Sequence, residues 1–93
     1  MPSPREPMLF VAQLKVMPGQ LDEATRLFKR PRLPNNVMVH EFLALLGKPD
    51  AVVIFEAPDA STAADFVTQF GHVAETITSL ALPIEELKWT SQA

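Results

Sequence analysis

Apolar and polar positions along the chain fall into six segments, each repeating with the period of a strand or a helix. Four of them alternate every second residue or form short β-rich runs, and two carry apolar residues three or four positions apart. The expected strands are 8–16, 37–46, 51–57 and 73–82, and the expected helices are 20–30 and 59–71. The order β-α-β-β-α-β predicts an α+β, ferredoxin-like fold: a four-stranded antiparallel sheet with both helices on one face.

The third expected strand, 51–57, is apolar on both of its faces, so both faces need cover. Two short helices can cover only one face of the sheet. The other face, hereafter the open face, would expose Leu9, Val11 and one apolar set from each of the strands 37–46 and 51–57. An exposed apolar patch of that size usually marks an interface. We therefore expect a homodimer in which two sheets pack face to face across a two-fold axis.

Strict alternation divides the apolar side chains of the strand 37–46 into two sets. One set consists of Val39, Leu43 and Leu45, and the opposite set consists of Met38, Phe42 and Leu46. Asp59 is expected to be the N-cap of the second helix. The whole is expected to be one domain over 8–89, with a disordered leader at 1–7 and a tail at 90–93. Near the end of the domain, a helical turn and Trp89 would supply apolar contacts.

Composition narrows the classes of function. The 93 residues carry a net charge of −3, which argues against nucleic acid or an anionic membrane surface as a partner. Without cysteine there is no thiolate chemistry, and no phosphate loop or paired-histidine spacing is present, so neither a cofactor nor a metal is expected. No apolar run reaches membrane-spanning length, and residues 1–7 lack the apolar core of a signal peptide. The expected location is the cytoplasm.

The stretch 47–59, Gly-Lys-Pro-Asp-Ala-Val-Val-Ile-Phe-Glu-Ala-Pro-Asp, resembles the GYD family of small dimeric α+β-barrel proteins. Met-Leu-Phe-Val at 8–11, Pro-Gly-x-x-Asp-Glu-Ala at 18–24 and Leu-Pro-Ile-Glu-Glu at 82–86 are similar to a neighbouring uncharacterised family of like length. The chain departs from the GYD motif at Pro49, where the family usually has tyrosine. The resemblance implies the fold and the sheet-to-sheet dimer. Its superfamily includes cofactor-independent monooxygenases, isomerases and cyclases.

His40 is the best single candidate for an acid or base, because histidine changes charge near physiological pH. A structural role at a sheet edge or at the dimer seam is the alternative. Glu56 lies on the neighbouring strand, beside either His40 or Glu41 depending on a one-residue choice of register. A His–Glu pair would suit proton transfer, whereas Glu56 at the solvent end of its strand would not. Gln13 and Lys15 point to the open face, where they would line a pocket mouth or bond across the dimer.

Two classes of function follow from these residues. The first is binding of a small, largely apolar organic molecule between sheet and helices or between two sheets. Cofactor-independent oxygenase- or isomerase-type chemistry at His40 and Glu56 would extend this function. The second is a non-catalytic dimer for regulation or assembly, with its barrel filled by its own side chains. The open face mixes apolar residues with Gln13, Lys15 and either His40 or Glu41, and this mixture favours a ligand cavity.

Overall fold

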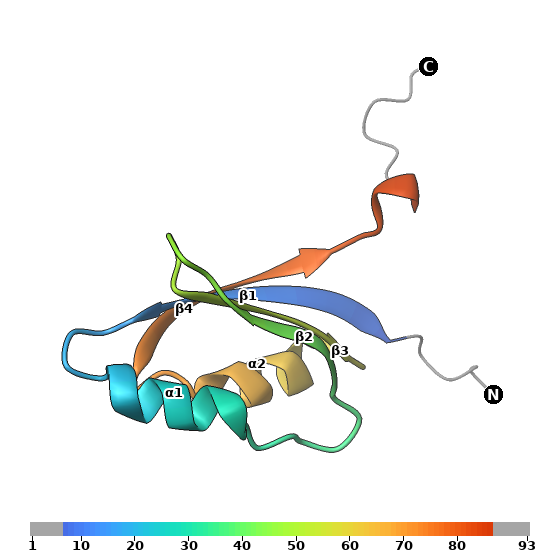
Figure 1. Cartoon of the computed structure of the whole chain (residues 1–93). Helices are drawn as coiled ribbons and strands as arrows, with labels where there is room; N and C mark the ends of the chain where they lie inside the picture. The colour runs from blue at the N-terminus through green and yellow to red at the C-terminus, as the bar shows by residue number, and fades with distance from the viewer. Residues whose placement is uncertain (1–6, 87–93) are drawn as a thin grey trace.

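An antiparallel sheet forms one layer of the molecule and two helices form the other (Figure 1). The computed structural model describes residues 7–86. Its elements are β1 (Met8–Val16), α1 (Leu21–Lys29), β2 (Met38–Ala44), β3 (Ala51–Ala57), α2 (Ala60–Thr68), β4 (Ala74–Ala81) and the 3-10 turn η1 (Ile84–Glu86). The strand order is β2-β3-β1-β4, which confirms the expected ferredoxin-like α+β fold. The expected roles of residues 1–6, Trp89 and the tail 90–93 fall outside the described residues.

The core is a single layer of side chains between the sheet and the helices. Alternate residues of the two central strands are buried there: Phe10, Ala12 and Leu14 of β1, and Ala51, Val53, Phe55 and Ala57 of β3. From the helical layer, Phe66 packs with its ring centroid 4.7 Å from that of Phe55, and Phe70 packs edge-on against Phe66 at 5.5 Å. Because the helices lie on one side of the sheet only, the other side keeps an open face (Figure 1).

The strand β2 departs from the strict alternation that its sequence predicts. Its pairing with β3 shifts register between Val39 and Glu41, so His40 lies in a β-bulge. Val39 pairs with Phe55 and Phe42 pairs with Val53, which places Val39 and Phe42 together on the helix side. The ring centroid of Phe42 is 5.2 Å from that of Phe28 and 5.8 Å from that of Phe70. The predicted division of β2 into two sets is therefore wrong, because one extra residue reverses the alternation.

The predicted N-cap of α2 is confirmed. The side chain of Asp59 accepts a hydrogen bond of 2.7 Å from the backbone N–H of Thr62. We expect Asp59→Ala to lower the free energy of unfolding by about 1 kcal/mol, because this N–H would lose its partner. Urea denaturation measures the change. Ser61→Ala, at an exposed position of the same helical turn, is the control and should leave the unfolding midpoint unchanged; equal midpoints for both variants would contradict the capping role.

Candidate functional site

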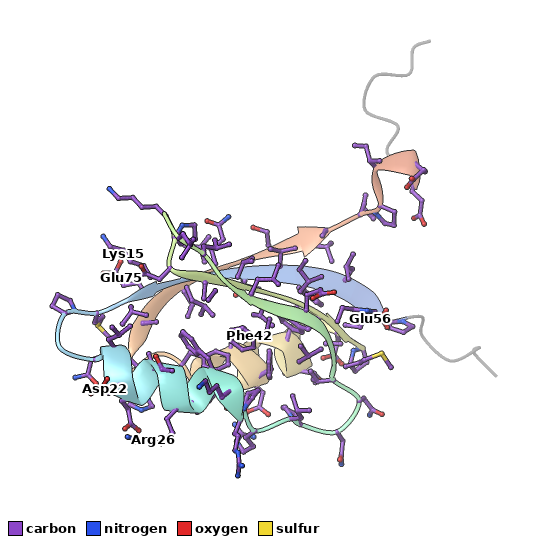
Figure 2. All side chains as sticks on the ribbon, viewed as in Figure 1. Lys15, Asp22, Arg26, Phe42, Glu56 and Glu75 are labelled. Carbon is purple, nitrogen blue, oxygen red and sulfur yellow. The ribbon has the colours of Figure 1, made fainter. Side chains whose placement is uncertain are left out.

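The open face combines an apolar centre with polar ends. Its centre consists of Val11 on β1 and Val52 and Ile54 on β3, all half-buried in the single chain. Ile77 of β4 is 65% exposed there. The register pairs place Val11 opposite Ile54 and Glu56 opposite Leu9. Charged side chains lie toward the two ends of the strands, with Glu56 at one end and Lys15 and Glu75 at the other (Figure 2).

His40 and Glu56 are brought together at one end of this face. Nε2 of His40 lies 2.6 Å from Oε2 of Glu56, and the two side chains are 40% and 31% exposed. Glu56 pairs in register with Met38, and Glu41 pairs with Ile54. Neither of the two registers that the sequence left open occurs, since Glu56 lies opposite Met38, but the side chain of Glu56 contacts that of His40.

This contact assigns different tasks to the two nitrogens of the imidazole. An ionised Glu56 accepts only, so in the neutral ring Nε2–H donates to it and the proton is held on Nε2. Nδ1 then carries a lone pair and is the nitrogen left to accept a proton from another molecule. When it does so, the carboxylate stabilises the imidazolium that forms. The pair therefore has the parts of a general base.

A hollow of about 470 Å³ adjoins the pair. It is lined by Pro7, Asn36, Val37, Met38, Glu56 and Pro58. Its walls are mostly apolar, with the Glu56 carboxylate and the Asn36 amide as polar groups, which is the usual make-up of a small-molecule site. Asn36 reaches this place in the left-handed backbone region, at φ 71°, which asparagine tolerates better than most residues. Sequence reasoning missed Asn36, Met38 and Pro58, although the turn before β2 and the proline after β3 mark adjacent strand ends.

A second hollow, of about 420 Å³, lies toward the opposite end of the open face. It is lined by Gln13, Lys15, Lys48, Pro49, Asp50, Glu75 and Ile77. The carboxylate of Asp50 accepts a 2.8 Å hydrogen bond from the N–H of Val16, which ties the β2–β3 hairpin to the end of β1. Lys15 is six residues beyond Leu9, the partner of Glu56, which corresponds to about 20 Å along β1. Within one subunit, Gln13 and Lys15 are therefore not brought to His40 and Glu56.

A third hollow, of about 380 Å³, lies on the helix side, between α1 and β2. It is lined by Thr25, Phe28, Lys29, Phe42, Leu43, Ala44 and Ala51. Lys29 is the only charged residue among them, and His40 and Glu56 do not line it. Phe28 and Phe42, which pack against each other with ring centroids 5.2 Å apart, form an apolar wall against which a small molecule would fit. An acid–base reaction there would have only a lysine to use, so the open face is the better place for chemistry.

Residues 7–86 contain no group of three or more His, Asp or Glu side chains placed to hold a metal ion. No helix within them is long and apolar enough to cross a membrane.

Fold and site together define a small ferredoxin-like α+β protein with an uncovered sheet face and a His–Glu pair at one end of it. A comparison with protein-family models matches residues 8–93 to a domain of unknown function, DUF3303. Because the match spans nearly the whole chain, the protein belongs to the DUF3303 family. The match does not confirm the resemblance to the GYD family. No curated protein matches the chain.

Proposed function

We propose that this protein is a cytoplasmic homodimer that binds a small, mainly apolar organic molecule beside His40 and Glu56. The observation that carries the proposal is the 2.6 Å contact between these two side chains, one of which lines a largely apolar hollow of about 470 Å³. General bases are commonly built from a histidine held by a carboxylate. The hollow is large enough for a bicyclic organic molecule and offers it few polar partners.

Dimerisation through the open face is part of this proposal, in the manner of a GYD-like dimeric α+β barrel. The apolar centre of the face has no helix over it in the single chain (Figure 1). The tip of the β2–β3 hairpin and the segment after β4 both rise on that same side (Figure 1). They carry the exposed apolar residues Leu46, Leu82 and Ile84. A second copy of the chain would cover the face and give these residues apolar neighbours.

The reaction best suited to the pair is a proton transfer on a carbon next to a carbonyl group. Nδ1 of His40 takes a proton from that carbon, which leaves an enolate, and Glu56 stabilises the imidazolium. In a ligand whose enolate is conjugated with a carbon–carbon double bond, return of the same proton to the far carbon of that double bond completes an isomerisation with no other reactant. In an oxygenase version of the proposal, the enolate carbon reduces dioxygen and, with one proton, becomes a hydroperoxide; cleavage of its O–O bond with loss of water leaves a new carbonyl, so one oxygen atom stays in the product and the other leaves as water. Both versions begin with the same proton removal.

A non-catalytic dimer for regulation or assembly is the second candidate. It is favoured by the branched apolar side chains Val11, Val52 and Ile54, which would fill the space between two sheets. In that case the His40–Glu56 contact would serve only the stability of the fold. The two candidates differ in whether the imidazole does chemistry.

Hydrogen–deuterium exchange on a carbon acid distinguishes them. We expect the protein to speed the incorporation of deuterium from D₂O into 2-tetralone, an apolar bicyclic ketone, as followed by proton NMR. His40→Ala should reduce the enhancement by about 100-fold, the lower range for loss of a general base. Glu56→Gln should reduce it as well, because a neutral amide stabilises the imidazolium less.

The second histidine provides the matched control. His72 is exposed in the turn after α2, so His72→Ala should keep the full enhancement. Amide chemical-shift changes on adding 2-tetralone should gather at Val37, Met38 and Glu56. Shift changes at these residues without any enhancement would favour the non-catalytic candidate. An equal loss in His72→Ala and His40→Ala would contradict the assignment of the base.

A further inference from the structure

The open face carries opposite charges at its two ends. At the end where β2 begins and β3 finishes, the Glu56 carboxylate, opposite Leu9, faces away from the helices, and Glu41, opposite Ile54, faces the same way beside the centre of the face. At the other end, Lys15 and Lys48 line one hollow. Within residues 7–86 neither lysine takes part in an ion pair. Figure 2 shows Glu56 and Lys15 at opposite ends of the sheet.

Carboxylates at the lysine end do not cancel this asymmetry. Glu75 is the register partner of Lys15 on β4, and Asp50 also lines the hollow. The Asp50 carboxylate already accepts the N–H of Val16. This end therefore holds two lysines and two carboxylates, whereas the Glu56 end holds one carboxylate and a histidine. The lysine end is the more positive of the two.

The direction of the two-fold axis decides which ends meet. Sheets that face each other across a two-fold axis have that axis in the plane between them. In aligned packing, with strands crossing at about 30°, the axis runs nearly along the strands or nearly across them. An axis along the strands puts like ends together, and an axis across the strands exchanges the ends.

The arrangement that brings the two Glu56 ends together is the unfavourable one. Since β1 and β3 are the two central strands, the Glu56 side chains of the two subunits would approach each other near the axis. The two Glu56 carboxylates, one from each subunit, would then lie at the same end of a partly dehydrated interface. Like charges juxtaposed in an interface cost several kcal/mol in general. With the ends exchanged, each glutamate end meets a lysine end.

We propose that two copies pack their open faces with the ends exchanged, so that Lys15 of the partner subunit lies beside His40 and Glu56. This inference rests on the dimer of the proposed function. It accounts for two side chains, Gln13 and Lys15, that lie about 14 Å and about 20 Å along β1 from the register partner of Glu56 in their own subunit. Each dimer would hold two composite sites, one at either end.

Lys15 of the partner subunit would add an ammonium group to the site beside His40 and Glu56, where the single chain places no lysine. Proton removal by His40 leaves negative charge on the oxygen of an enolate, and the residues around the nearby hollow offer only the Asn36 amide to receive it. A lysine ammonium from the other subunit would stabilise that charge. The site would then be complete only in the dimer.

Reversal of single charges tests the arrangement by analytical ultracentrifugation. Lys15→Glu would set two carboxylates against each other at both ends, and Glu56→Lys would set two cations together. Each is expected to raise the dimer dissociation constant by at least about tenfold. The double variant K15E/E56K restores opposite charges at both contacts, so its dissociation constant should return to within about threefold of the original. Lys29→Glu, on the exposed surface of α1, should have no effect.

The other outcomes would contradict either the exchanged packing of the two subunits or the dimer itself. Under like-end packing, a reversal replaces one like-charge pair by another, so single variants with an unchanged dissociation constant would overturn the proposal. Failure of the double variant to restore association would overturn it as well. An unmodified protein that sediments as a monomer would instead overturn the dimer of the proposed function.

Cross-linking gives a second measurement that does not depend on charge repulsion. Lys15→Glu also brings a carboxylate next to Glu75 of its own subunit, so the fold of that variant must be checked by circular dichroism. The chain has no cysteine, which makes single cysteine variants clean probes. With a short bismaleimide, a mixture of K15C and E56C chains should cross-link after subunit exchange, and neither variant alone should. Efficient linking of E56C to itself would overturn the exchanged arrangement.

Discussion

Phe55→Ala is expected to lower the free energy of unfolding by about 3–5 kcal/mol, the usual range for a buried phenylalanine. Phe55 lies on a central strand and is fully buried. Its ring centroid is 5.5 Å from that of Phe10 and 4.7 Å from that of Phe66, so it joins the sheet to α2. The loss would be a large share of the total for a domain of this size, about 5–15 kcal/mol. Urea denaturation at one fixed protein concentration measures it, since dimerisation makes stability depend on concentration.

Leu21→Ala is the matched control for the loss of apolar volume. Leu21 begins α1 but is 65% exposed, so its truncation should change the free energy of unfolding by less than about 0.5 kcal/mol. If the two variants unfolded at similar urea concentrations, the single buried layer between sheet and helices could not be the main source of stability.

Local pattern was enough to predict the central strands. The bounds of β1 and β3 in the structure are those expected from the sequence, because both strands have regular side-chain patterns and proline follows closely after each. The helices α1 and α2 are shorter by a few residues than their periodic segments. Helix ends depend on capping and on contact with the sheet, which periodicity alone does not report.

The bulge in β2 could not be predicted from the sequence around it. The segment Val39-His40-Glu41-Phe42 contains no glycine or proline to mark an irregularity. Its position is decided by pairing with β3, which aligns Val39 with Phe55 and Phe42 with Val53 and leaves one residue over. Both pairings join residues that are distant in the sequence, so the local pattern around His40 does not report them.

The candidate site could also be predicted only in part, because its contacts depend on how the strands pair. Parity along β1 and β3 places Gln13, Lys15 and Glu56 on the open face, as the structure has them. Their separation depends on the β1–β3 register, which pairs Glu56 with Leu9 at the far end from Lys15. The hollow beside Glu56 depends on the arrangement of strand ends and turns around Asn36 and Pro58. The role of the His–Glu pair stays a proposal, and so does the dimer.

Ile54→Asp is expected to convert the proposed dimer to a folded monomer. Ile54 lies at the centre of the open face, opposite Val11 on the neighbouring strand. In a sheet-to-sheet dimer the substitution would bury two unpaired carboxylates near the axis, which should raise the dissociation constant by at least about 100-fold. In the separated subunit the same position borders water, so the fold should persist. Sedimentation equilibrium gives the association state, and circular dichroism reports the fold.

Leu80→Asp separates an effect on the open face from a general effect of adding charge to the sheet. Leu80 is 59% exposed and pairs with Phe10, so it lies on the helix side of the edge strand β4, where the helices do not cover it. The same apolar-to-acidic change there should leave the dissociation constant within about twofold of the original, because that side of the sheet is outside the proposed interface. Dissociation by Leu80→Asp but not by Ile54→Asp would place the interface at the β4 edge and end the case for a face-to-face barrel. It would also remove the ground for a composite site, since Lys15 and Glu56 would then stay at opposite ends of one exposed face.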